Sequence, residues 1–408
     1  MFRSYHEIFQ TPGTKGFSAA GFIARMPISM MGIGIVTMLS QLRGEYWLAG
    51  AVAATFALAS ALLAPHISRL ADRLGQSRVL LPAAGISVTA AAILLLCTRF
   101  GAPDWTLFLA ALFAGGMPNM AAMVRARWAA ILGGSPKLHT AFSFESVVDE
   151  ICFIIGPIVS VSLSVAVFPE AGPLLSCVFL LTGVVLFTLQ KGTEPKVRPI
   201  DPEEKGSVIK LGSLQALVFT LAAMGVIFGA VDVVTVAFAE EQGNKVAASI
   251  VLSIYAVGSC LAGLVYGTLS LKAPLHRQFL QAVALCMVMM LPLFLVSNLF
   301  SLAIVVFFAG LSVAPTMIVT MGLVEKIVPR SMVTEGMTWA ITGLGIGVAL
   351  GSAVAGWVID GFGSQAGFMV AIVAGVLAML IAGLGYRSLR SAHIRAISRA
   401  EEAAVKHG

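Results

Sequence analysis

Charged side chains are scarce in this sequence of 408 residues, in which Lys, Arg, Asp and Glu together make up 11%. Soluble globular domains contain about 25% of these residues. Apolar residues instead make up 58% of the chain, and they gather in runs of about 20, the length that an α-helix needs to cross a bilayer. The composition therefore excludes a soluble protein and indicates an integral membrane protein.

The sequence also lacks the motifs of metal sites and enzymes. Its five cysteines, Cys97, Cys152, Cys177, Cys260 and Cys286, lie in apolar runs without the spacing of a metal site or a disulfide framework. We interpret them as packed thiols, because a free cysteine behaves as a small hydrophobic residue. No P-loop, zinc-protease helix or nucleophile elbow is present, and the polar loops are short. We therefore expect neither an enzyme nor a bound metal or cofactor.

Twelve stretches of the chain are long and apolar enough to be membrane-spanning helices. We expect them at about 17–41, 46–68, 79–98, 105–131, 140–168, 172–190, 211–239, 246–270, 278–297, 299–325, 335–360 and 365–388. The sequence thus predicts an all-α membrane protein.

The basic residues are distributed unevenly between the two sides of these spans. If the N-terminus lies in the cytoplasm, all but four of the 26 Lys and Arg residues fall in or next to cytoplasmic loops. The exceptions are Arg43, Arg99 and Lys245 on the opposite side and Arg25 within a span. Cytoplasmic loops of membrane proteins contain an excess of Lys and Arg. The distribution predicts a multi-pass protein with both termini in the cytoplasm, and it accounts for the net charge of +6 without nucleic acid as a partner.

The longest polar segment, "KGTEPKVRPIDPEEKGS", divides the spans into two sets of six. The sets resemble each other, because "LFAGGMPNMAAMV" in the fourth span is echoed by "FFAGLSVAPTMIV" in the tenth. Such duplication is typical of transporters whose substrate site lies between two halves. We expect an N-terminal six-helix bundle at 1–190, a cytoplasmic linker at 191–210, a C-terminal six-helix bundle at 211–389 and a cytoplasmic tail at 390–408.

The loop after the second span reads "SRLADRLGQSR". It resembles the signature that the major facilitator superfamily has between its second and third spans, a glycine followed by x-L-A-D-R-x-G-R-(K/R)-(R/K). The matching residues are Leu70, Ala71, Asp72, Arg73, Gly75 and Arg78, while Ser68, Gln76 and Ser77 depart from the signature. With the twelve spans and the duplication, the resemblance covers the whole chain and implies that family's fold of two pseudo-symmetric six-helix halves.

The resemblance implies a gating role for the signature. Asp72 would accept hydrogen bonds from the N-terminus of the eleventh span, where the helix dipole favours an anion. Arg73 and Arg78 would bridge neighbouring helix ends, with Gly75 at the turn, so that the cytoplasmic side is held in one of two states. In the alternative interpretation, these charges only fix the topology.

A second resemblance lies in "GPIVSV" within the fifth span. Antiporters of the superfamily have a stretch that contains Gly and Pro in this helix, and here Gly156 and Pro157 correspond to it. A proline deforms its helix and a glycine allows close packing. The pair therefore indicates either antiport or a purely structural kink.

The fifth span contains three carboxylates, Glu145, Asp149 and Glu150, although acids are costly within a bilayer. At a rise of ~1.5 Å per residue, Asp149 and Glu150 lie near the midplane, and so does Arg25 of the first span. We expect Arg25 to pair with one acid, by preference Asp149, and the other, by preference Glu150, to exchange a proton during transport. The alternative is a static buried salt bridge.

Four further residues are candidates for the site. Arg125 and Arg127 in the fourth span are expected at the depth of Glu145, in a cytoplasmic ionic cluster. Asp232, the acid within the seventh span, would contact substrate or water, or cap a broken helix segment. Asn119 would line the substrate cavity, or bind backbone carbonyls freed by the neighbouring proline.

Two functions fit these features. The leading hypothesis is a proton-coupled exporter of small organic molecules, because the chain resembles the bacterial drug and sugar efflux branch of the superfamily. The alternative is a proton symporter that imports a small organic anion, with Arg25 as the substrate clamp. In both, the proton gradient is the energy source and no cofactor is needed. We expect a monomer in the bacterial inner membrane, whose partners are a small-molecule substrate, protons and lipid.

Overall fold

The computed structural model describes residues 2–44, 46–197, 206–243, 247–269, 271 and 273–407, and these are helical almost throughout. The chain forms two compact units. The first unit comprises Phe2–Leu138 and Val148–Glu204, and the second comprises His139–Val147 and Lys205–Gly408. Residues 198–205 of the expected linker lie outside the described residues.

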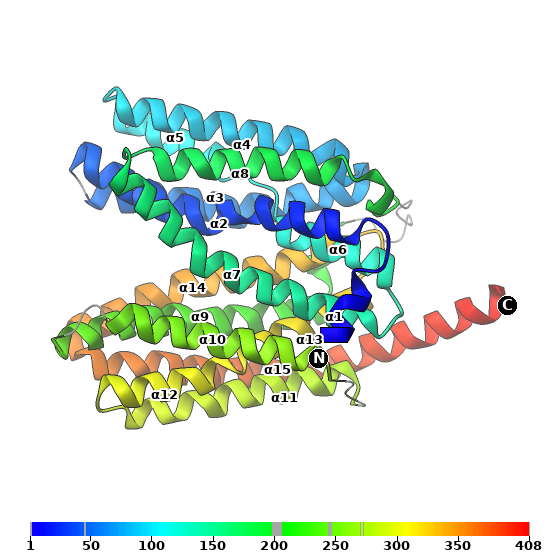
Figure 1. The fold of residues 1–408 in the computed structure, drawn as a ribbon. Coiled ribbons are helices and arrows are strands. Elements are labelled where there is room, and N and C mark those ends of the chain that lie inside the picture. The colour runs from blue at the N-terminus through cyan, green and yellow to red at the C-terminus, as the bar shows by residue number, and fades with distance from the viewer. Residues whose placement is uncertain are drawn as a thin grey trace. The chain divides into compact units, whose positions relative to one another are not determined.

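The helices of the first part of the chain are α1 (Phe2–Ile8), α2 (Thr14–Arg43), α3 (Tyr46–Leu74), α4 (Gln76–Arg99), α5 (Asp104–Ala114), α6 (Met120–Leu132), α7 (Lys137–Ala166), α8 (Ala171–Thr188) and the short η1 (Lys191–Thr193). Those of the second part are η3 (Val208–Lys210), α9 (Gly212–Glu241), α10 (Ala247–Tyr266), α11 (Leu275–Met290), η4 (Leu291–Leu295), α12 (Leu299–Gly310), α13 (Val313–Ile327), α14 (Val333–Phe362) and α15 (Ser364–His407). Figure 1 shows long helices side by side within each unit.

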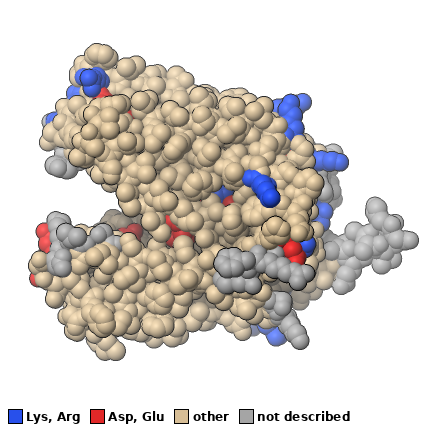
Figure 2. All heavy atoms as spheres, in the orientation of Figure 1, with Lys and Arg blue, Asp and Glu red and all other residues tan. Residues whose placement is uncertain are grey.

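The protein is all-helical, and the length and apolar composition of its helices are those of a membrane protein. In the described part of the chain, ten helical segments are long and apolar enough to cross a membrane, and α5 and α10 are shorter apolar helices. Figure 2 shows that residues other than Lys, Arg, Asp and Glu cover most of one face of the molecule. This arrangement is what a bilayer requires, because charged groups are costly within its apolar core.

The fourth span is broken, which corrects the expectation of one helix over 105–131. The helix α5 ends at Ala114, and α6 begins only at Met120. At the break, Gly115 packs so closely on α3 that a Cβ atom there would lie 2.6 Å from the carbonyl oxygen of Phe56. The next helix begins where the Asn119 side chain accepts a hydrogen bond from the Ala122 amide, a typical N-cap.

Hydroxyl groups join α2 and α7 within the first unit. The Ser29 hydroxyl lies 2.9 Å from the carbonyl oxygens of Met26 and Cys152, and Ser160 Oγ donates to Met30. Gly156 faces this contact, since a Cβ atom there would lie 2.0 Å from Ser29 Oγ. The helix continues through Pro157 to Ala166. Gly156 is therefore a point of close packing in a helix that the proline does not end.

Glycine backbones join α9 and α14 within the second unit. A Cβ atom at Gly347 would lie 1.9 Å from the carbonyl oxygen of Ala222, and one at Gly225 would lie 2.1 Å from that of Leu344. Gly229 and Gly351 make similar approaches to the opposite helix. These helices therefore touch backbone to backbone, which small residues permit in membrane proteins.

The first turns of α7 group with the second unit through two side chains. His139 Nε2 lies 2.8 Å from the Tyr266 carbonyl oxygen, and Thr140 Oγ1 donates to the Gly267 carbonyl at 2.8 Å. The last carbonyls of a helix have no partner within the helix, so these contacts cap the end of α10.

Candidate functional site

Asp149 on α7 binds two arginines within the first unit. Its Oδ1 lies 2.8 Å from Nη1 of Arg25 on α2, and its Oδ2 lies 2.6 Å from Nη2 of Arg125 on α6. Hydrogen bonds between ionised groups are short and strong, and these two join three helices at one carboxylate. The pairing of Arg25 with Asp149 agrees with the expectation from helix depth, whereas Arg125 was not expected here.

The three side chains differ in exposure. Arg25 is 3% exposed and Arg125 is 1% exposed, whereas Asp149 is 24% exposed. Arg25 Nε also donates to the Gly21 carbonyl of its own helix, at 3.3 Å. The guanidinium groups are therefore buried, and the carboxylate is the part of this cluster that a proton or a ligand can reach.

A glycine and a helix cap place Arg125 beside α2. A Cβ atom at Gly21 would lie 2.3 Å from Cγ2 of Val124, so the glycine allows α6 to approach α2 closely. The Asn119 cap begins α6 less than two turns before Arg125. Side chains in a helix tilt toward its N-terminus, which directs Arg125 away from the end of α6.

Asn119 has a structural role that differs from the expected substrate contact. It is 6% exposed, and its Oδ1 lies 3.1 Å from the Ala122 amide nitrogen. This interaction serves a freed backbone group, the alternative that the neighbouring proline suggested, although the group is an amide and not a carbonyl. The cap uses Oδ1 of Asn119, and contact of this side chain with substrate stays a prediction.

Glu145 and Glu150 occupy different environments on α7. Glu145 is fully buried, and it lies in the segment 139–147 that groups with the second unit. Glu150 is half-buried and follows Asp149 directly, about 100° further around the helix. The two neighbouring acids therefore face in different directions, as the helix geometry requires.

Arg127 corrects the expected cytoplasmic cluster of Glu145, Arg125 and Arg127. Its Nε donates to Gln76 Oε1 at 2.9 Å, and its Nη1 donates to Thr193 Oγ1 at 2.8 Å. Its guanidinium carbon also lies 3.7 Å from the centre of the Phe187 ring. Arg127 thus joins the start of α4 to the end of α8, while Arg125 pairs with Asp149, so the cluster was wrong for both arginines.

The signature loop lies between α3 and α4. Gly75 has a φ of 97°, a conformation that favours glycine, and it forms the turn before α4. The Ser77 amide donates to Glu194 Oε1 at 2.8 Å, and Gln76 Nε2 donates to the Met123 carbonyl at 3.1 Å. Two residues that depart from the signature therefore make specific contacts here, and no motif in the sequence indicates Glu194 as a partner.

The charged residues of the signature lie at the surface of the first unit or near it. Asp72 is half-buried, and Arg73 and Arg78 are exposed. In the second unit, Asp232 is exposed on α9.

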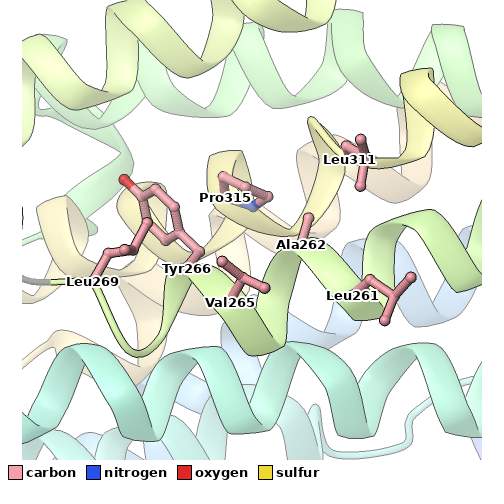
Figure 3. Close-up of a pocket in the computed structure, with 7 residues that line it drawn as sticks. All are labelled: Leu261, Ala262, Val265, Tyr266, Leu269, Leu311 and Pro315. Atoms are coloured by element: carbon pink, nitrogen blue, oxygen red, sulfur yellow. The ribbon is translucent and has the colours of Figure 1, made fainter. Parts of the chain in front are cut away.

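The second unit has an open apolar groove of about 280 Å³ (Figure 3). Its lining residues are Leu261, Ala262, Val265, Tyr266, Leu269, Leu311 and Pro315. The Tyr266 hydroxyl donates to Gln278 Oε1 at 2.9 Å, so it already has a partner. The groove lacks the convergent polar groups of a substrate site. Nor do three potential metal ligands come together anywhere among the described residues.

Comparisons with known proteins agree with this architecture. A sequence profile described as Major Facilitator Superfamily matches residues 17–301 and 217–406, which together span almost the whole chain. No curated protein sequence matches the chain.

Solved structures share the fold. The human organic anion transporter MFSD10 (TETRAN) superposes with a TM-score of 0.69 at 15% identity, over 91% of this chain and 100% of that chain. A bacterial homologue of the iron transporter ferroportin, in an outward-facing state, superposes with a TM-score of 0.73 at 12% identity, over 93% of this chain and 99% of that chain. A second structure of a bacterial ferroportin homologue, outward-facing and with soaked iron, superposes with a TM-score of 0.69 at 14% identity, over 91% of this chain and 99% of that chain. At these identities the likeness concerns the fold alone.

Proposed function

Because the chain belongs to the major facilitator superfamily, whose members are secondary transporters and not enzymes, we propose that it exports small organic molecules in exchange for protons. Alternating access between two six-helix halves, 1–190 and 211–389, is the transport mechanism of this proposal. The protein acts as a monomer in the bacterial inner membrane. Both termini lie in the cytoplasm, as the distribution of Lys and Arg favours.

The main support for proton coupling is the pair of neighbouring acids on α7, the half-buried Glu150 and Asp149, whose accessible carboxylate is bound to two buried arginines. A change of charge at Asp149 alters the ion pairs that hold α2 and α6 to α7. Protonation and helix packing are thereby linked at one point. Acids and arginines within membrane spans commonly form proton or substrate pathways, because their burial is otherwise costly.

Within this acidic pair we assign anchoring to Asp149 and proton exchange to Glu150. Asp149 uses both of its oxygens on Arg25 and Arg125. Glu150 is half-buried and faces a different direction on the same helix. Asp232, exposed on α9, is a second candidate for contact with substrate or water.

The signature loop supplies the gate in this proposal. Asp72 binds the N-terminus of α14 in one state of the cycle, where the helix dipole favours an anion. Arg73 and Arg78 add contacts to neighbouring helix ends, and Gly75 keeps the turn between α3 and α4 tight. Replacing Asp72 by Asn should shift the protein toward states open to the cytoplasm, as distances between labels on that face would report.

The second candidate is import of a small organic anion together with protons. Arg25 and Arg125 direct two guanidinium groups to one accessible point. Paired guanidinium groups are also what a carboxylate or phosphate ligand requires. In this case the substrate replaces Asp149 as the partner of Arg25.

A ligand screen followed by flux measurements tests the proposal. Ligands are first identified by thermal shift on the purified protein, because a ligand of the folded state raises its melting temperature. Hits are then offered to proteoliposomes with a pH gradient of either sign. An exchanger accumulates substrate in vesicles with an acidic interior, and a symporter does so in vesicles with an alkaline interior. Flux that is indifferent to both gradients would contradict proton coupling, and protein-free vesicles measure the leak.

A further inference from the structure

Two buried histidines face each other in the second unit. Nδ1 of His276, at the start of α11, lies 3.0 Å from Nδ1 of His393 on α15. Each residue is 5% exposed, and the ring of Tyr386 lies edge-on to His276 at 5.6 Å. The helices α11 and α15 pack against each other, so the pair belongs to their contact.

The contact between two Nδ1 atoms depends on the number of protons. A hydrogen bond needs one nitrogen that donates and one that accepts, which a neutral pair or a pair with one extra proton can provide. When both rings are fully protonated, both nitrogens are donors and neither accepts. The second extra proton therefore breaks this contact and sets two positive charges against each other.

The groups around the pair are mostly cationic. Arg277 on α11 and Arg390 on α15 act electrostatically on His276, and Lys326 on α13 acts on His393. The carboxylate of Glu325 lies 3.5 Å from Lys326 Nζ and so partly offsets that charge. The pair thus has a cationic surrounding on all three of these helices, in which the repulsion between two imidazolium rings is little compensated.

The pair holds the extension of the last helix. The 44 residues of α15 are roughly 66 Å long at ~1.5 Å per residue, whereas a bilayer core is ~30 Å thick. His393 lies roughly 43 Å along this helix from Ser364, beyond the length that a span needs. Figure 1 shows that α15 reaches past the other helices of its unit at the C-terminal end. The histidine contact joins this extension to the beginning of α11.

We propose that His276 and His393 form a proton-sensitive clasp, closed at neutral pH, which releases the extension of α15 from α11 when its surroundings acidify. If the C-terminus lies in the cytoplasm, as in the proposed function, the clasp responds to the pH of the cytoplasm. The clasp itself requires only the contact within the second unit, so its test does not depend on whether transport is driven by protons.

Paired spin labels measure the release. The labels are attached at Gln281→Cys on α11 and Arg395→Cys on α15, both exposed positions, in a chain whose five native cysteines are replaced. Distances are compared at about pH 8 and about pH 4.5, because the second proton enters a buried pair that is already positive and therefore needs a pH well below the imidazole pKa of ~6.5. We expect one short distance at the higher pH and a second, longer population at the lower pH.

Histidine variants assign this response to the clasp. The double variant His276→Gln/His393→Gln can form a side-chain hydrogen bond but cannot titrate, so it should keep the short distance at both pH values. His393→Lys keeps a donor opposite the neutral ring of His276 at the higher pH and sets a cation against its protonated ring at the lower pH, so it should respond like the parent chain. His66→Gln removes an exposed histidine on α3 and should respond like the parent chain.

Two results would overturn the clasp. One is an identical distance distribution of the parent chain at both pH values. The other is a pH response that persists in the double glutamine variant. If that variant does not fold, His393→Asn alone removes one of the two titrating rings and should abolish the response in the same way.

Discussion

The two units hold their helices together by different chemistry. In the first unit, Asp149 and its two arginines join α2, α6 and α7, and the Ser29 hydroxyl lies at the contact of α2 with α7. In the second unit, the contact of α9 with α14 is made by glycine backbones. Lipid gives helices little hydrophobic reason to associate, so both polar contacts and small residues are effective.

The two kinds of contact respond differently to a change of charge: an ion pair weakens when one partner is neutralised, whereas a contact between glycine backbones is unaffected. An ion pair changes its strength with the charge of Asp149, whereas the approach of Gly347 to Ala222 depends only on shape. The first unit thus has a charged contact between α2, α6 and α7, whereas the contact of α9 with α14 in the second unit depends on backbone shape. The proposed coupling acids lie in the first of these.

Removing the charge at the centre of the first unit should have the largest effect. Asp149→Leu deprives two buried guanidinium groups of their common carboxylate, and breaking a buried pair costs about 3–5 kcal/mol. Thermal unfolding of the purified protein should show a large loss of stability. Asp104→Leu, which removes a 57% exposed acid at the start of α5, is the matched control.

A double variant separates charge from packing in this unit. Arg125→Met combined with Asp149→Leu removes both members of one ion pair and should be more stable than Asp149→Leu alone. Equal losses for Asp149→Leu and the Asp104→Leu control would show that the first unit does not depend on its charged core.

Substitution of a glycine at the contact of α9 with α14 should cause an intermediate loss of stability. Gly347→Ala places a Cβ atom 1.9 Å from a backbone oxygen, and overpacking a core costs about 1–3 kcal/mol. Gly345 on the same helix has open space around it, so Gly345→Ala should be neutral or stabilising, as alanine favours helices by ~1 kcal/mol. Chemical denaturation of both variants measures the difference. The same response at both positions would remove the distinction between the units.

The hydroxyl contact between α2 and α7 should give the smallest effect. Ser29→Ala removes one hydrogen-bonding group and should cost about 1 kcal/mol. Gly156→Ala alone introduces a clash with Ser29 Oγ, which the first substitution removes. In a double-mutant cycle the two changes together should therefore cost less than the sum of the single changes. Strict additivity would mean that Gly156 does not pack against this hydroxyl.

Helix depth along the sequence predicted the partner of Arg25 but not that of Arg125. The depth estimate compares Cα positions, and it matched Arg25 with Asp149 because both belong to continuous helices. For Arg125 it failed because the fourth span is interrupted, and because a long side chain extends toward the start of its helix. The close approach at Gly21, which brings Val124 onto α2, has no local sequence signal.

Side-chain contacts between segments far apart in the sequence could not be predicted either. Arg127 binds Gln76 and Thr193 and stacks on Phe187, and no periodicity in the sequence joins these positions. The glycines of α14 are visible in "GLGIGVALG", but the sequence does not say which helix they face. Ten of the expected spans, by contrast, follow from apolar length alone, which explains why the fold was the easier prediction.

Proton exchange at an acid of α7 is tested most directly by comparing two kinds of transport in liposomes, with a ligand found by the thermal-shift screen. Glu150→Gln and Asp149→Asn nearly preserve shape and remove titration, so counterflow without a proton gradient should survive. Proton-driven accumulation should fail in at least one of them, by preference Glu150→Gln, while Asp104→Asn retains both activities. If both α7 variants keep driven transport with an unchanged pH dependence, the acids are structural and coupling must be sought at Asp232.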